Sequence, residues 1–162
     1  MRRGPLLERM VVECLRRAKR TLATAESCTG GLLANRITNV EGCSRVFLEG
    51  FILYSDKAKS DRLHLPESTI RSCGAVSKEV ATEMAERLLN LSGAHYALCT
   101  TGVAGPTRGT QQLSIGTVFI GLASPQVPTQ VYRGLFPESR ETFKQLAVDA
   151  ALGILYRRLL DA

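Results

Sequence analysis

The stretch "TLATAESCTGGLLANRI", residues 21–37, joins a short apolar run to a helical pattern. Residues 21–25 predict a buried strand, and residues 28–38 predict a helix whose first turn holds Gly30 and Gly31. Glycine in a first helical turn costs up to about 1 kcal/mol relative to alanine and is usually kept for the close approach of a ligand or another backbone. A phosphate or an oxyanion would fit at this junction.

Strand and helix patterns alternate outward from this junction. Further strands are predicted at residues 46–54, 95–101, 115–123 and 128–136, the last two joined by "SPQVP", which favours a hairpin. Helices are predicted over residues 6–15, around 56–63, after Pro66, between the cap Ser77 and the stop Gly93, and from residues 137–139 onward. Alternating strands and helices followed by two successive strands predict an α/β sandwich with a mixed sheet.

Length and composition predict one domain over residues 1–162. The chain is 44% hydrophobic and 22% charged, which is enough for one packed core. No apolar run approaches the roughly 18 residues of a membrane span, and the basic N-terminal segment lacks a signal-peptide apolar region. We therefore expect a cytoplasmic protein with no membrane partner. The five cysteines are scattered without metal-ligand spacing, and this predicts free thiols and no metal site.

The formal net charge of +6 is concentrated near the N-terminus. Seven basic and two acidic residues lie within residues 1–20, a pattern typical of a solvated helix face. Because no basic patch interleaved with aromatic residues and no recognition-helix pattern is present, we expect no nucleic-acid partner. The charge suits a small anionic substrate equally well.

Ser27 stands where the first predicted strand ends, at the edge of open α/β sheets where functional groups collect. A serine there is either a helix N-cap or a nucleophile that needs a base. The two histidines are poor candidates for that base. Lys57 and Lys59 follow another strand end and could reach the same edge, although their spacing also fits surface lysines. The other lysines fall on faces that look solvated: Lys19, Lys78 and Lys144.

The segment "TTGVAGPTRGT", residues 100–110, is a second junction that could carry function. It runs from a strand end into three glycines and a proline. Its spacing matches neither a P-loop nor a dinucleotide-binding fingerprint. It is therefore either a connector between strands or a glycine-rich ligand loop.

Five blocks taken together resemble one family over nearly the whole chain. They are "TAESCTGGLLANRIT", "GFILYSDKAKSDRL", "GAVSKEVATEMA", "TTGVAGPTRGT" and "IGTVFIGLAS", which match in order the blocks of the CinA C-terminal domain. The resemblance implies a three-layer α/β/α sandwich with a mixed sheet. It also implies a nicotinamide-nucleotide amidase (NMN deamidase, PncC type), which hydrolyses the carboxamide of nicotinamide mononucleotide to nicotinate mononucleotide and ammonia. No cofactor is implied, and homo-oligomers are common in the family.

The resemblance assigns roles residue by residue. It places the family's serine, tyrosine and lysine at Ser27, Tyr54 and Lys59. The chemistry of an amide then predicts that Ser27 is the nucleophile, that Lys59 is its base, and that either Lys59 or Tyr54 delivers a proton to ammonia. Backbone N–H groups at the start of the helix would hold the oxyanion. The expected substrate contacts are Cys28, Thr29, Gly30, Gly31, Thr101, Gly102 and Arg140. An arginine at the start of a helix opposes the helix dipole, which predicts that Arg140 binds an anion, the substrate phosphate.

The chain also departs from the family pattern near the expected site. Asp56 stands where asparagine is usual, and Lys57 stands where an acidic residue is common. Thr107 and Arg108 replace part of a glycine-rich loop. The alternative to an amidase is therefore a catalytically inert nucleotide-binding or protein-interaction module of the same fold.

Overall fold

A mixed five-stranded sheet forms the centre of the computed structural model, which describes residues 6–107 and 113–162. The strand order is β2-β1-β3-β4-β5, with β1 parallel to both β2 and β3, and with β3–β4 and β4–β5 antiparallel. The strands are β1 Leu22–Glu26, β2 Phe47–Ile52, β3 Tyr96–Gly102, β4 Thr117–Ser124 and β5 Val127–Leu135. The predicted mixed sheet and its final hairpin are confirmed.

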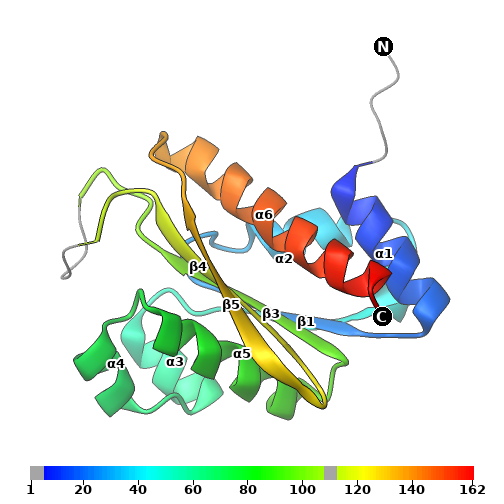
Figure 1. Cartoon of the computed structure of the whole chain (residues 1–162), viewed down its shortest axis with the longest axis horizontal. Helices are drawn as coiled ribbons and strands as arrows, with labels where there is room; N and C mark the ends of the chain where they lie inside the picture. The colour runs from blue at the N-terminus through cyan, green and yellow to red at the C-terminus, as the bar shows by residue number, and fades with distance from the viewer. Residues whose placement is uncertain (1–5, 108–112) are drawn as a thin grey trace.

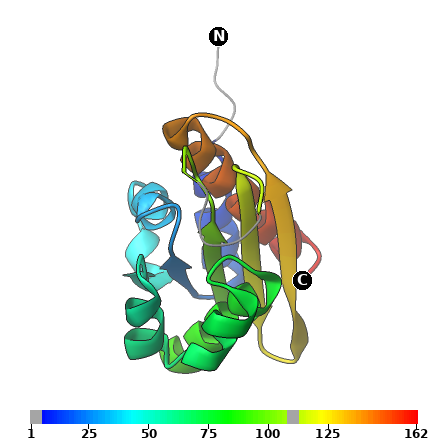
Figure 2. The ribbon, with the colours of Figure 1, turned by 90° about the vertical axis from the view of Figure 1, so that its left-hand side faces the viewer.

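Helices cover both faces of the sheet (Figures 1 and 2). One layer holds α1 Leu7–Ala18, α2 Leu32–Thr38 and α6 Arg140–Leu160, and the other holds α3 Asp56–Leu63, α4 Glu67–Cys73 and α5 Lys78–Ser92; a short 3₁₀ turn, η1, spans Cys43–Arg45. Two apolar cores lie between these layers and the sheet, one built around Phe143 and Leu98 and the other around Met84 and Leu63. This is the three-layer α/β/α sandwich that the resemblance implied.

Local capping explains where α5 begins and ends and where α6 begins. The side chain of Ser77 accepts a hydrogen bond from the Val80 N–H at 3.2 Å, and Gly93 ends α5 in the left-handed region at φ +64°. Ser139 accepts from the Thr142 N–H in the same way and starts α6 at Arg140. All three boundaries were predicted from these residue types. In the described part of the chain, no helix combines the length and the apolar character that crossing a membrane requires.

The start of α2 differs from the prediction. The helix begins at Leu32, and Gly30 and Gly31 lie before it at φ +59° and +96°. The two glycines therefore form a left-handed turn between β1 and α2, a conformation that other residues adopt only with strain. Ser27 consequently cannot be the N-cap of α2, because Gly31 occupies that position.

Candidate active site

The carboxyl ends of β1, β2 and β3 meet at one edge of the sheet. In the parallel register, Glu26 lies beside Ile52 on one side and Thr100 on the other. The Ser27 N–H donates to the Thr100 carbonyl at 3.0 Å, so the first residue after β1 is still fixed to β3. The register therefore brings Ser27, the segment after β2 and the end of β3 together.

The buried carboxylate of Glu26 fixes the turn that follows Ser27. Its Oε2 accepts hydrogen bonds from the Thr29 hydroxyl at 2.6 Å and from the Gly31 and Leu33 N–H groups at 3.1 and 3.0 Å. Its Oε1 accepts from the Ala34 N–H at 2.8 Å. Sequence reasoning missed this role, although a single acidic residue ending an apolar strand was a usable signal.

These bonds change the expected oxyanion site. The helix-start N–H groups of Gly31, Leu33 and Ala34 already donate to Glu26, so they are not available to a substrate. The backbone N–H groups of Cys28 and Thr29 donate to no acceptor within residues 6–107 and 113–162. Of these two residues only Cys28 lines the hollow, so the candidate donor lies in the turn directly after Ser27 rather than at the start of α2.

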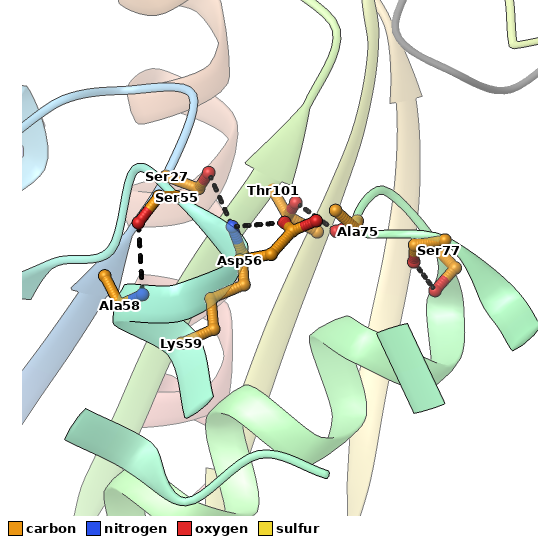
Figure 3. Close-up of polar contacts among 9 residues, drawn as sticks. Ser27, Ser55, Asp56, Ala58, Lys59, Ala75, Ser77 and Thr101 are labelled. Carbon is orange, nitrogen blue, oxygen red and sulfur yellow. Dashed lines mark hydrogen bonds and ion pairs between the residues drawn. The ribbon is translucent and has the colours of Figure 1, made fainter. Parts of the chain in front are cut away.

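Lys59 reaches the Ser27 hydroxyl from α3. Its side chain is only 2% exposed, and its Nζ lies 3.4 Å from the Ser27 Oγ and 3.8 Å from the Asp56 Oδ1 (Figure 3). Burial lowers the pKa of Lys59 below its ordinary value, and the nearby Asp56 carboxylate partly opposes that shift. A lysine with a lowered pKa is a usable base, because more of it is neutral near pH 7.

The structure separates the two lysines that spacing alone left open. Lys57 points into solvent and forms an ion pair with Asp61 at 2.6 Å. Lys59 lies two positions further along α3, on the face that packs inward. The Ser55 hydroxyl accepts the Ala58 N–H at 3.1 Å and so starts α3 in the register that aims Lys59 at Ser27 (Figure 3).

A hollow of about 230 Å³ opens beside Ser27 and Lys59. The Thr101 hydroxyl donates to the Ala75 carbonyl at 2.7 Å and joins the loop before α5 to the end of β3 (Figure 3). Gly102 is packed so closely that a Cβ there would lie 2.7 Å from the Thr117 carbonyl oxygen.

The lining of this hollow contains most of the predicted site residues, namely Ser27, Cys28, Tyr54, Lys59, Thr101, Gly102 and Arg140. It also contains Asp56 and Thr107, two positions where the chain departs from the family pattern. Arg108 lies outside the described residues.

Tyr54 and Arg140 meet at the rim of this hollow. The Arg140 guanidinium donates one hydrogen bond to the Tyr54 hydroxyl and another to the Gly105 carbonyl, at 2.8 Å for the latter. The Tyr54 hydroxyl has its hydrogen bond with Arg140, not with Ser27 or Lys59. Arg140 is the first residue of α6, as predicted, where its charge opposes the helix dipole unless an anion is close.

Three predicted substrate contacts lie outside the lining of the hollow. Thr29 is fully buried and bonds to Glu26 and Thr100, and Gly30 and Gly31 shape the turn. Lys144, in contrast, was expected on a solvated face, yet its Nζ lies 3.6 Å from the position that a Cβ would take at Gly30.

Lys144 follows Arg140 by one helical turn, so both cations share the face of α6 that looks toward the Ser27 turn. The i, i+4 spacing from Arg140 was the signal for it. Among the described residues, no group of three His, Cys, Asp or Glu side chains is arranged to hold a metal ion.

Comparison with known proteins agrees with this architecture. The model of the CinA C-terminal domain matches residues 6–159. A putative competence-damage inducible protein of Thermoanaerobacter pseudethanolicus is 44% identical over 154 residues, which cover 95% of this chain and 37% of the relative. A CinA-like protein of Leptospira biflexa is 42% identical over 87% of this chain and 34% of its own length. The chain thus spans little more than a third of these curated relatives.

Solved structures give the same result. A CinA superfamily protein from Klebsiella pneumoniae superposes with a TM-score of 0.92 at 30% identity, covering 96% of this chain and 97% of that one. A competence/damage inducible protein from Agrobacterium tumefaciens superposes with a TM-score of 0.87 at 31% identity, covering 96% and 97%. The chain belongs to the CinA C-terminal domain family.

Proposed function

We propose that this domain is an amidase that hydrolyses the carboxamide of nicotinamide mononucleotide to nicotinate mononucleotide and ammonia. The observation that carries the proposal is the approach of the buried Lys59 Nζ to within 3.4 Å of the Ser27 Oγ. Among the described residues no carboxylate lies closer to the Lys59 Nζ than Asp56 at 3.8 Å, and such a buried lysine is expensive to keep in a core, so a role in chemistry accounts for its position.

The reaction begins with proton transfer from Ser27 to neutral Lys59. The serine oxygen attacks the carboxamide carbon, and the backbone N–H group of Cys28, which lines the hollow, stabilises the negative charge on the carbonyl oxygen. Protonated Lys59 then gives its proton to the departing ammonia, so that the C–N bond breaks and an acyl-serine remains. Water, deprotonated by Lys59, hydrolyses the ester and restores Ser27.

Two cations on α6 favour a substrate with a phosphate. Arg140 lines the hollow and presents a planar guanidinium, which suits the oxygens of a phosphate. Lys144 lies one turn further along the same helix, against the Ser27 turn. An anion between them would also offset the unfavourable position of Arg140 at the start of α6. Tyr54 orients Arg140 through its hydroxyl in this arrangement.

The test is ammonia release by the purified protein from nicotinamide mononucleotide and from nicotinamide riboside. The amidase proposal predicts ammonia and nicotinate mononucleotide in equal amounts, with the riboside a poor substrate. If the mononucleotide binds in calorimetry but releases no ammonia, the domain is the inert nucleotide-binding module instead. If it neither binds nor reacts, the proposed substrate is wrong.

A further inference from the structure

A second hollow lies at the opposite edge of the sheet from Ser27. It measures about 640 Å³, and its lining includes Thr21 and Val46, the residues that precede β1 and β2. Helix α1, blue in Figure 1, runs into β1 at this end. At about 3.3 Å of rise per residue, Thr21 and Ser27 lie about 20 Å apart, so this hollow is separate from the candidate active site.

An adjoining hollow of about 460 Å³ extends this one between α1 and the loop that holds η1. The two share Glu13, Arg16 and Arg45 in their linings. We call the combined depression the amino-edge groove. Its charged residues are five cations and two carboxylates: Arg9, Arg16, Arg17, Lys19 and Arg45, with Glu13 and Glu41.

The five cations of the amino-edge groove are exposed, and the described part of the chain offers them no ion pair. Within residues 6–107 and 113–162, none of the five lies within 4.0 Å of a carboxylate oxygen, although two carboxylates line the same groove. Arg36 on the neighbouring helix α2 shows the contrasting case, because Glu8 and Asp149 hold its guanidinium from two sides. The groove therefore keeps a local excess of positive charge.

Helix electrostatics accounts for only part of this charge. Arg16 and Arg17 lie in the last turn of α1, where a cation is favourable. Arg9 lies in the first turn, since α1 begins at Leu7, and there a cation opposes the dipole. Arg45 is the last residue of η1 and does not belong to α1. Helix electrostatics therefore does not account for Arg9 and Arg45, both of which are exposed to solvent and free to meet an anion.

The Arg16 side chain extends across the groove to the loop at Gly42. A Cβ built at Gly42 would lie 3.4 Å from its Nη1 and 3.6 Å from its Cζ, so the guanidinium rests on the backbone of that loop. Gly42 has a φ of +79°, which other residues adopt only with strain, and its missing side chain leaves room for the arginine. The Arg16 guanidinium therefore lies over the loop that holds η1, beside Arg45 in the lining of the same groove.

We propose that the amino-edge groove binds the phosphate chain of a small ligand with two or more phosphates. Arginines pair with phosphate oxygens in bidentate geometry, and three of them line a depression of ligand-pocket size. The apolar members of the described lining are Val12, Val40 and Val46, and none is an aromatic ring that could stack on a base. Recognition is therefore by the phosphates, and not by a nucleobase.

The test is calorimetry with tripolyphosphate at fixed ionic strength, with amide NMR to locate the site. We expect tripolyphosphate to bind about tenfold or more tightly than monophosphate and to shift the amide resonances of Gly42 and Val46. The double variant Arg16→Gln/Arg45→Gln weakens it about tenfold or more. The matched variant Arg62→Gln/Arg71→Gln, which removes the same charge from the exposed surface of α3 and α4, weakens it by less than about twofold.

Three results with tripolyphosphate would overturn the proposal, and a fourth concerns ATP. One is no binding of tripolyphosphate at millimolar concentration, and another is equal weakening by the two double variants, which would reduce the effect to net charge. The third is a shift of the Gly102 and Thr101 amides in place of Gly42 and Val46, which would place the anion in the hollow beside Ser27. ATP serves as a further comparison, because affinity about tenfold or more above that of tripolyphosphate would contradict recognition by phosphate alone.

Discussion

The Nζ of Lys59 lies 3.4 Å from the Oγ of Ser27, although 32 residues separate them along the chain. Parallel pairing of β1 with β2 makes this possible, because it ends both strands at the same edge of the sheet. The turn after β1 then presents the serine, and α3, which starts shortly after β2, presents the lysine.

Asp56→Asn should shift the pH dependence of the amidase to lower pH. The rate rises with pH as Lys59 loses its proton, and the exposed Asp56 carboxylate raises the pKa of Lys59 against the effect of burial. At pH values below the midpoint of this rise, kcat/KM of the variant should exceed that of the wild type about two- to fivefold. This factor corresponds to the loss of an exposed ion pair worth up to about 1 kcal/mol. Asp61→Asn is the control, because Asp61 pairs with Lys57. A limb that stays in place or moves to higher pH contradicts Lys59 as the base.

Lys59→Met should abolish turnover and yet stabilise the fold. Burial lowers the pKa of Lys59 in the folded state, so between the folded and unfolded pKa values the unfolded chain binds more protons, and stability rises with pH. At pH values where the lysine is charged in both the folded and the unfolded state, the cost of burying its charge is complete. Because burial still disfavours the wild type near pH 7, the variant should be about 1 kcal/mol more stable there. Its advantage should shrink as pH approaches the ordinary lysine value.

Denaturant unfolding at several pH values measures this difference, and Lys57→Met serves as the control. Lys57 is exposed, so its replacement should change stability by less than about 0.5 kcal/mol. A Lys59→Met protein that is less stable than the wild type at pH 7 would show that the lysine is a structural group.

Glu26→Gln should both destabilise the protein and slow catalysis. The carboxylate accepts four hydrogen bonds, whereas an amide oxygen accepts fewer and its NH₂ group would face a backbone N–H. We expect a loss of about 3 kcal/mol in unfolding free energy, with kcat reduced more than KM because the Ser27 turn is displaced. Glu79→Gln, at an exposed position in the first turn of α5, is the control. A Glu26→Gln protein with wild-type stability and kcat would show that the Glu26 carboxylate does not fix the Ser27 turn.

Patterns that depend on near neighbours were predictable from the sequence. The helix between Ser77 and Gly93 was predicted because a cap, an amphipathic period and a stop lie within one segment. The start of α2 was not, because the turn is decided by contacts of Gly31 with Glu26, five positions earlier. A helix-period pattern cannot show that a strand residue caps the next helix with its carboxylate.

The candidate site was predictable as a location and only partly as a set of residues. The predicted strand ends placed Ser27 at the edge of the sheet where the structure has the hollow. Spacing gave no reason to prefer Lys59 over Lys57, because only burial distinguishes the two lysines. Lys144 was missed for a related reason. A lysine on an amphipathic helix looks solvated until the turn packed against it, at Gly30, is known.

Arg140→Ala and Lys144→Met should each raise KM for nicotinamide mononucleotide more than they lower kcat. A charge-assisted contact with phosphate is worth about 1.5 to 3 kcal/mol, or about ten- to a hundredfold in binding. Neither variant should alter kcat/KM for nicotinamide riboside to a similar degree, and Lys78→Met on α5 should have no effect. Equal losses for both substrates would mean that these residues do not contact the phosphate.

The initial rate of ammonia release from nicotinamide mononucleotide by Ser27→Ala, measured beside Cys28→Ala, tests the central claim most directly. The two residues are neighbours in one turn, but burial raises the pKa of the Cys28 thiol to about 12, so it holds no reactive thiolate near neutral pH. The account predicts that Ser27→Ala lowers kcat by a factor on the order of 10³ or more, with its fold intact, while Cys28→Ala keeps most of the activity. A Ser27→Ala protein that releases ammonia within a few-fold of the wild-type rate would contradict the assignment of Ser27 as the nucleophile.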